Sequence, residues 1–123
     1  MRIEETGIDG VTIDLKPLDF LMEKAGFVRT AAWDYERVTY DYKIDTPKTN
    51  ETIYIRVQGY AVEGEVDSGS AVITLLTPLL GRHYYPHGIE YGEEEGFSTH
   101  VLDKTKRVLE QVAESLKEFR TNK

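Results

Sequence analysis

The sequence contains no cysteine, and this absence excludes disulfide bonds, thiolate zinc sites and a cysteine nucleophile. It also lacks any run of about 18 apolar residues, the length that a membrane-spanning helix requires. The first residues, MRIEE, are acidic, whereas a secretory signal begins with a basic stretch followed by an apolar one. We therefore expect a cytoplasmic protein with no membrane partner.

Basic residues are outnumbered, because 15 lysines and arginines face 22 aspartates and glutamates, for a formal net charge of −7. A chain of this charge is repelled by a phosphate backbone and by an anionic bilayer. We therefore expect no nucleic-acid partner.

Two motifs common in enzymes are missing. No glycine-rich loop that could cradle a phosphate is present, and Ser68-Gly69-Ser70 lacks the pattern of a nucleophile elbow and is typical of a turn. We expect no cofactor, and a non-catalytic protein is favoured over an enzyme.

Apart from these absences, the composition is typical of one folded domain. The 123 residues are 40% hydrophobic and 30% charged, and a chain of this length buries roughly two thirds of its unfolded surface. No repeat, low-complexity tract or linker divides the chain, so a single domain over residues 1–123 is predicted.

Helical patterns occur near both ends of the chain. A short helix is predicted from Pro17 to Gly26, since proline suits the first turn and glycine the left-handed stop, after which Phe27 packs back on the last turn. A second helix of about 20 residues is predicted after Ser98, a candidate N-cap. Its apolar stripe consists of Val101, Thr105, Val108, Leu109, Val112, Leu116 and Phe119.

Residues 28–62 are rich in β-branched and aromatic residues with a period of two, and the stretch 11–15 alternates in the same way. A change of phase at 34–37 predicts a tight turn or a bulge, of which a hairpin turn is favoured, and a second change after Gly59 predicts a bulge. Residues 71–76 are apolar enough for a central strand.

After that strand, residues 77–81 are interpreted as a capped single helical turn, and the chain as far as Phe97 as irregular. The predicted order is strand, helix, four strands, helix. This order predicts a two-layer α+β fold in which the long C-terminal helix covers one face of an antiparallel sheet.

Several motifs together resemble the YugN-like family of Bacillus-type bacteria. They are Trp33-Asp34-Tyr35-Glu36-Arg37, Thr39-Tyr40-Asp41-Tyr42-Lys43, Val62-Glu63-Gly64-Glu65, Leu75-Leu76-Thr77-Pro78, His83-Tyr84-Tyr85-Pro86-His87-Gly88 and the closing helix. The resemblance implies a fold similar to one half of the TATA-binding protein, with the same order of elements. It implies no activity, because the family brings no catalytic motif and a fold does not define a function.

The segment 82–91 is the first candidate site, because it concentrates two of the three histidines and three tyrosines in a predicted loop. If it is helical, His83 and His87 lie one turn apart, and Glu90 or one of the three glutamates at 93–95 could complete a divalent-metal set. The alternative is that its aromatic residues pack the loop onto the sheet. The candidate ligand-binding residues here are Tyr84, Tyr85, His87 and Tyr91.

Aromatic residues of the predicted strands form the second candidate site, together with two arginines. Trp33, Tyr35 and Arg37 are the candidate ligand-binding residues, and Tyr40, Tyr42, Tyr54 and Tyr60 could extend the group along a sheet face. Arg37 and Arg56 could clamp a carboxylate or phosphate, although a surface ion pair is the commoner role. Ordinary cross-strand packing is the alternative for the aromatic group.

Three functions stay open on these grounds. The first is a non-catalytic binding module for a small ligand or a protein partner, self-association included. The second is a small metal-assisted enzyme that uses His83 and His87. The third is a purely structural interaction protein.

Overall fold

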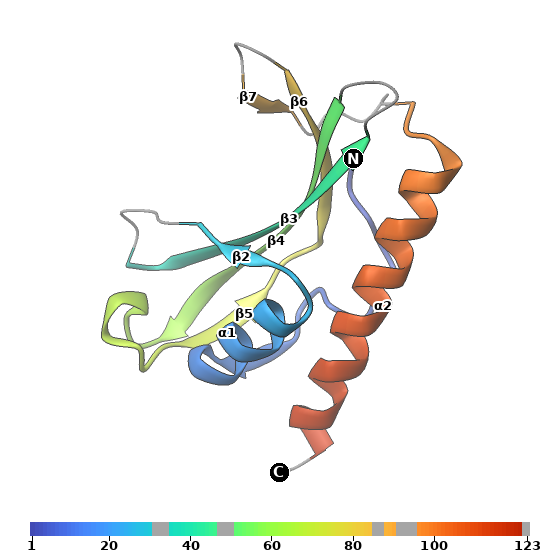
Figure 1. Cartoon of the computed structure of the whole chain (residues 1–123). Coiled ribbons are helices and arrows are strands. Elements are labelled where there is room, and N and C mark those ends of the chain that lie inside the picture. The colour runs from blue at the N-terminus through green and yellow to red at the C-terminus, as the bar shows by residue number, and fades with distance from the viewer. Residues whose placement is uncertain (31–34, 47–50, 85–87, 91–95, 122–123) are drawn as a thin grey trace.

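A computed structural model describes the chain except for residues 31–34, 47–50, 85–87, 91–95 and 122–123 (Figure 1). The described elements, in chain order, are β1 (Thr12–Asp14), α1 (Leu15–Lys24), β2 (Val28–Arg29), β3 (Arg37–Thr46), β4 (Glu51–Glu63), the 3-10 helix η1 (Val66–Ser68), β5 (Val72–Leu75), β6 (Leu79–Tyr84), β7 (Gly88–Glu90) and α2 (Thr99–Thr121).

The seven strands form one antiparallel sheet in the order β1-β5-β4-β3-β2, and β6 joins it by pairing with β4 and with β7. Strand β4 is the longest at 13 residues and pairs with all ten residues of β3 along one edge. Its other edge is shared, since Ile53 to Arg56 pair with β6 and Gly59 to Glu63 pair with β5. The sheet curves strongly, and both helices lie on its convex side (Figure 1).

One buried cluster draws residues from β1, α1, β3, β4, β5, β6 and α2. The alternation of side chains along a strand explains which strand residues are buried, because the even-numbered residues of β3 and the odd-numbered residues of β4 face the helices. The helical stripe of α2 is confirmed from Val101 to Leu116, whereas Phe119 is 36% exposed. The α+β class, with an antiparallel sheet packed against the C-terminal helix, is thus confirmed, and the likeness to half of the TATA-binding protein stays a prediction.

The ends of the helices follow the capping pattern of the sequence. Gly26 has φ +100°, and the N–H groups of Gly26 and Phe27 donate to the carbonyls of Glu23 and Met22 at 3.0 and 2.9 Å. This is the arrangement in which a left-handed glycine ends a helix and the next side chain packs back, and Phe27 is 2% exposed. At the start of α2, the Ser98 hydroxyl accepts the N–H of Val101 at 3.2 Å, as expected of an N-cap.

The predictions of a helical turn at 77–81 and of irregular chain beyond it are wrong where the structure describes two further strands. Leu79–Tyr84 and Gly88–Glu90 form the β6–β7 hairpin, so six strands follow α1 where four were expected. Of the β6 residues whose burial is described, 79–83, only Leu80 and Gly81 are buried, and Gly81, Arg82 and His83 interrupt any apolar alternation. The local sequence pattern therefore does not indicate a strand here. Strand β6 forms because it pairs with β4.

The β2–β3 hairpin is confirmed, because Val28 pairs with Asp41 and Arg29 with Tyr40 in an antiparallel register. The bulge, however, lies between Ala61 and Glu63 instead of at Gly59. A Cβ at position 59 would lie 2.5 Å from Cγ2 of Ile73, so Gly59 is required by the close approach of β5.

In the part of the chain that the structure describes, no helix combines the length and the apolar content needed to cross a membrane.

Replacing Leu109 with alanine should lower the free energy of unfolding by about 2–5 kcal/mol, because the side chain is 1% exposed in the core. Denaturant melts measure this loss. The exposed neighbour Gln111, replaced by alanine, serves as the control and should change stability by less than about 0.5 kcal/mol. A loss below about 1 kcal/mol for Leu109→Ala would contradict the assigned helix face.

Candidate functional site

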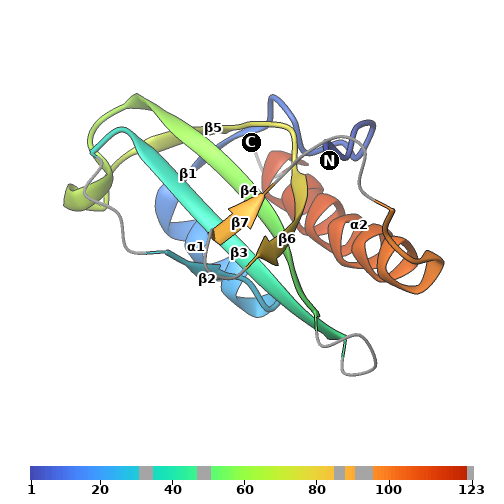
Figure 2. The same ribbon diagram turned by 90° about the horizontal axis from the view of Figure 1, so that it is seen from above.

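One face of the sheet carries no helix from the described chain: seen from above, α1 lies behind the strands and α2 lies mostly to their right (Figure 2). The alternation that sends one set of side chains into the core directs the other set to this open face. Its central positions are Arg37, Thr39, Asp41, Lys43 and Asp45 of β3 and Thr52, Tyr54, Arg56, Gln58 and Tyr60 of β4.

An ion pair occupies the middle of the open face. Asp41 and Arg56 lie directly opposite each other, and the guanidinium Nε and Nη2 donate to the two carboxylate oxygens at 2.8 and 2.9 Å. The Arg56 and Asp41 side chains are only 25% and 11% exposed, although no described helix covers them. A two-pronged contact of this kind locks both side chains and joins β3 to β4 on the solvent side.

Apolar residues flank this pair on the neighbouring strands. The backbone registers place Val28 of β2 beside Asp41, and Leu79 of β6 beside Arg56, in one row across the sheet. Val28 is 68% exposed.

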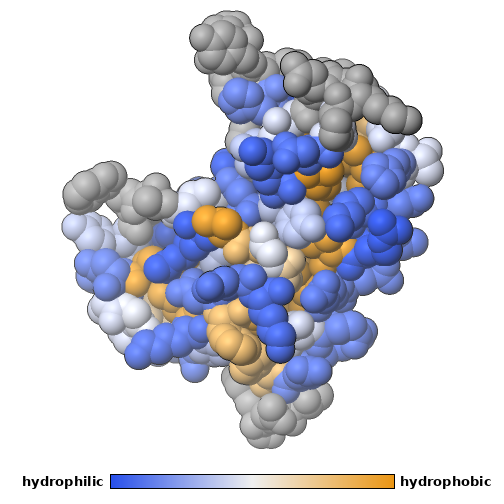
Figure 3. Space-filling view, viewed as in Figure 1, coloured by the Kyte–Doolittle hydropathy of each residue, from blue (hydrophilic) through white to orange (hydrophobic). Residues whose placement is uncertain are grey.

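Further along the face, Tyr60 lies between Arg37 of β3 and Thr74 of β5 and is 41% exposed. The Thr74 hydroxyl is 2.8 Å from the Thr12 hydroxyl of β1. The face therefore combines hydrogen-bonding groups with exposed tyrosine and aliphatic surface, and this side of the molecule is hollowed between its β2 and β6–β7 ends (Figure 3).

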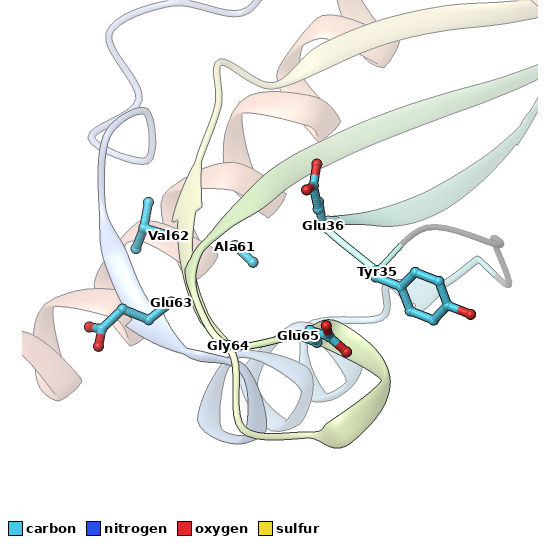
Figure 4. Close-up of a pocket in the computed structure, with 7 residues that line it drawn as sticks. All are labelled: Tyr35, Glu36, Ala61, Val62, Glu63, Gly64 and Glu65. Atoms are coloured by element: carbon cyan, nitrogen blue, oxygen red, sulfur yellow. The ribbon is translucent and has the colours of Figure 1, made fainter.

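A pocket of about 490 Å³ lies where β3 begins and β4 ends (Figure 4). Two backbone bonds hold its walls together: Ala61 N–H donates to the Glu36 carbonyl at 2.7 Å, and Val66 N–H to the Tyr35 carbonyl at 2.9 Å. The residues that line it are Tyr35, Glu36, Ala61, Val62, Glu63, Gly64 and Glu65.

The carboxylates of this pocket do not converge on one point. In Figure 4 the Glu63 side chain points away from Glu65 and Glu36, to the other side of the β4 backbone. Among the residues with described positions, no group of three or more histidine, aspartate or glutamate side chains could hold a metal ion.

A second pocket, of about 470 Å³, lies on the helix side between the N-terminal segment and α2. Its floor includes Leu109 and Thr105, both 1% exposed. The Thr105 hydroxyl donates to the Val101 carbonyl at 2.8 Å, so its proton is already engaged within the helix.

The helical segment that would set His83 and His87 one turn apart is not found at His83. His83 belongs to β6 and is exposed, whereas Glu90 belongs to β7 and pairs with Arg82, the residue before His83. Tyr84 ends β6. The predicted site residues Tyr85, His87 and Tyr91 lie outside the described residues.

The aromatic group is divided between the two faces of the sheet. Tyr40 is 1% exposed on the helix side, and its hydroxyl donates to Asp19 Oδ1 at 2.6 Å. Burial, followed by this hydrogen bond, raises the pKa of Tyr40 above its ordinary value, so the phenol is a neutral core group. Tyr42 packs edge-on against Phe27 with 5.4 Å between ring centroids.

Tyr54 and Tyr60 lie on the open face, and Tyr35, 58% exposed, lines the first pocket. Arg37 starts β3 opposite Tyr60, and Trp33 lies outside the described residues. The ion-pair role of Arg56 is confirmed. The sequence pattern does not indicate Asp41 as the partner of Arg56, because the two residues come together only in the register of β3 and β4.

These features define the class of protein: an α+β domain in which two helices cover one face of an antiparallel sheet and no described helix covers the other. The chain belongs to the YugN-like family, which it matches over residues 4–122. The family resemblance seen in the sequence motifs is therefore confirmed.

Two relatives come from Bacillus subtilis strain 168. The uncharacterized protein YlbA is 51% identical over 117 residues, a match that covers 95% of this chain and 96% of YlbA. The uncharacterized protein YugN is 29% identical over 91 residues, which cover 74% of this chain and 66% of YugN. A crystal structure of the uncharacterized conserved protein YugN from Geobacillus kaustophilus is similar with a TM-score of 0.84, at 48% identity and 98% coverage of both chains.

Removing either member of the central ion pair should destabilise the protein, and a double-mutant cycle of Asp41→Ala and Arg56→Ala should give a coupling energy of about 1–3 kcal/mol. The reason is the two-pronged geometry at low exposure. The exposed pair Glu114 and Lys117, 3.4 Å apart on α2, is the matched control and should couple by less than about 0.5 kcal/mol. Equal coupling in both cycles, measured by urea unfolding, would show that the open-face pair has no special strength.

Proposed function

We propose that this protein is a non-catalytic binding module whose open sheet face holds a small ligand or a protein partner. The observation that carries the proposal is the open face itself, on which tyrosine, arginine and exposed aliphatic side chains surround a locked ion pair. Tyrosine and arginine are the residue types that contribute most at binding surfaces, because each offers apolar area together with directed polar groups.

The curvature of the sheet supports a role in binding. A concave surface brings more of its side chains into contact with an occupant than a flat one does. The β6–β7 hairpin overhangs the open face when seen from above (Figure 2). The ion pair also holds two long side chains in place before binding, which lowers the entropy lost when a ligand arrives.

A binding role is favoured over catalysis by the chemistry of the described groups. The carboxylates of the pocket diverge, and the phenol with the clearly shifted pKa, that of Tyr40, is buried on the helix side. General acid–base or metal-assisted chemistry needs such groups to meet at one accessible point.

If the proposal is right, ligands found by titrating isotope-labelled protein with nucleotides, amino acids, sugars and short peptides should shift the NMR signals of open-face residues. The amides of Asp41, Arg56 and Tyr60 should move together, since their side chains share one surface. Tyr60→Ala should weaken binding of such a ligand by about tenfold, the effect expected of one aromatic contact.

The matched control is Phe20→Ala on α1, which removes an aromatic side chain that is 63% exposed on the opposite side of the sheet. This variant should bind with unchanged affinity. A ligand that shifts only the NMR signals of helix residues, or whose affinity Tyr60→Ala leaves unchanged, would refute the open face as the site. If no compound of the whole panel binds, this result would count against the proposal that the protein is a binding module.

A second prediction concerns polyanions. At low ionic strength the protein should bind neither duplex DNA nor phosphatidylserine vesicles, because the net charge of −7 repels both. Fluorescence anisotropy with labelled DNA and co-sedimentation with vesicles measure this, and a basic peptide that binds both confirms that the assays work. Salt-sensitive binding to either polyanion would contradict the prediction.

A further inference from the structure

The pocket of about 470 Å³ on the helix side has two walls that come from distant parts of the chain. One wall is the N-terminal segment from Ile3 to Thr6, and the other is the part of α2 from Leu102 to Glu110. The lining positions 102, 105, 106, 109 and 110 recur at steps of three and four, so they share one side of the helix. Figure 1 shows the N-terminal segment in blue beside α2.

Backbone hydrogen bonds hold the N-terminal wall in place. The Ile3 N–H donates to the Pro78 carbonyl at 2.8 Å, and the Gly10 N–H donates to the Leu75 carbonyl at 2.7 Å. Ile8, which lies between these bonds, is 0% exposed in the core. The wall is therefore fixed to the strands through its own backbone, and the pocket beside α2 is part of the fold.

The floor of the pocket is apolar. Leu109 and Thr105 are each 1% exposed, and Ile3 and Leu102 are partly buried against the core. Because the Thr105 hydroxyl already donates its proton to the Val101 carbonyl, its oxygen can only accept a further hydrogen bond. This floor favours an aliphatic occupant.

The rim of the pocket is acidic. Its charged side chains, all exposed, are Glu4, Glu5 and Glu110 against Lys106 alone. Glu4 already contacts Arg2 at 3.6 Å, whereas Glu5 and Glu110 form no ion pair with any described residue. Glu5 and Glu110 lie on opposite walls, so the rim complements an occupant with a positive charge at each end.

The backbone conformation of Glu5 is unusual. Among the described residues, Glu5 alone combines a positive φ, 60°, with a side chain. This left-handed region is disfavoured for a glutamate, and glycine adopts it at no steric cost. The rim therefore carries a carboxylate at a position where glycine would be less strained.

We propose that this pocket binds a linear aliphatic diamine or polyamine, with its methylene stem on the apolar floor and its ammonium groups beside Glu5 and Glu110. Burial of each methylene group is favourable, and an ammonium group is a donor that matches a carboxylate. The wall from Leu102 to Glu110 is about 12 Å long, at about 1.5 Å per residue, which accommodates a stem of several methylenes. This inference does not depend on the open face binding a ligand.

Isothermal titration calorimetry of the full chain with diaminohexane at low ionic strength tests the proposal. We expect a dissociation constant of about 1 mM or below. Diaminobutane has the same charges on a shorter stem and should bind about fivefold more weakly, and the uncharged hexanediol should bind more weakly by about tenfold or more. The proposal fails if diaminohexane does not bind, or if either control compound binds equally well.

Variants of the rim should change the affinity for diaminohexane in opposite directions. Glu110→Gln and Glu5→Gly each remove a carboxylate and should raise the dissociation constant by about tenfold, whereas Lys106→Gln removes a repelling charge and should lower it by about threefold. Glu23→Gln on α1 makes the same change in net charge outside the pocket and should have no effect. An equal loss with Glu23→Gln would show that only the net charge attracts the diamine.

Glu5→Gly also separates binding from folding. Glycine adopts φ +60° without strain, so this variant should unfold in urea at a midpoint no lower than that of the wild type while its affinity falls. A Glu5→Gly variant that binds diaminohexane as tightly as the wild type would contradict the role of this carboxylate.

NMR spectra of isotope-labelled protein locate the bound diamine. The amide signals of Thr105, Lys106 and Glu110 should move on addition of diaminohexane, because these residues line the pocket. The signals of Asp41 and Tyr60 on the open face should stay in place. Shifts confined to the open face would overturn the pocket as the diamine site, and the open-face titrations are independent of this result, so either proposal can fail alone.

Discussion

The pairing of β3 with β4 is the interaction on which the rest of the structure depends. Ten residues of β3 align with β4 without a shift, and the bulge of β4 comes only after this ladder ends. This single register decides which side chains face the helices and which face outward, since a slip by one residue would exchange the two sets. The two-pronged contact between Asp41 and Arg56 forms only in this register.

The two faces of that ladder have different energetic roles. On the helix side, residues such as Tyr40 and Ile55 are removed from water, and this burial is the main favourable contribution to folding. On the open side, stability gained from cross-strand pairs is smaller, and the side chains stay accessible. A face that contributes less to the core is free to carry groups that recognise another molecule.

Membership of the YugN-like family explains the architecture of this chain but not the chemistry of its open face. The chain shares 48% identity and a TM-score of 0.84 with the solved YugN of Geobacillus kaustophilus, so the architecture is common to both. A shared architecture defines where an open face lies, whereas the chemistry of that face depends on particular residues such as Arg56 and Tyr60.

The sequence by itself determined the elements whose signals are local. The glycine stop of α1, the Ser98 cap and the apolar stripe of α2 depend on residues within a few turns of one another, and each was predicted correctly, the stripe as far as Leu116. Only the tertiary structure decided the β6–β7 hairpin, the separation of Tyr40 from Tyr60 and the meeting of Asp41 with Arg56. The physical reason is that strand pairing joins residues far apart in the chain, and alternation assigns a face only after the register is known.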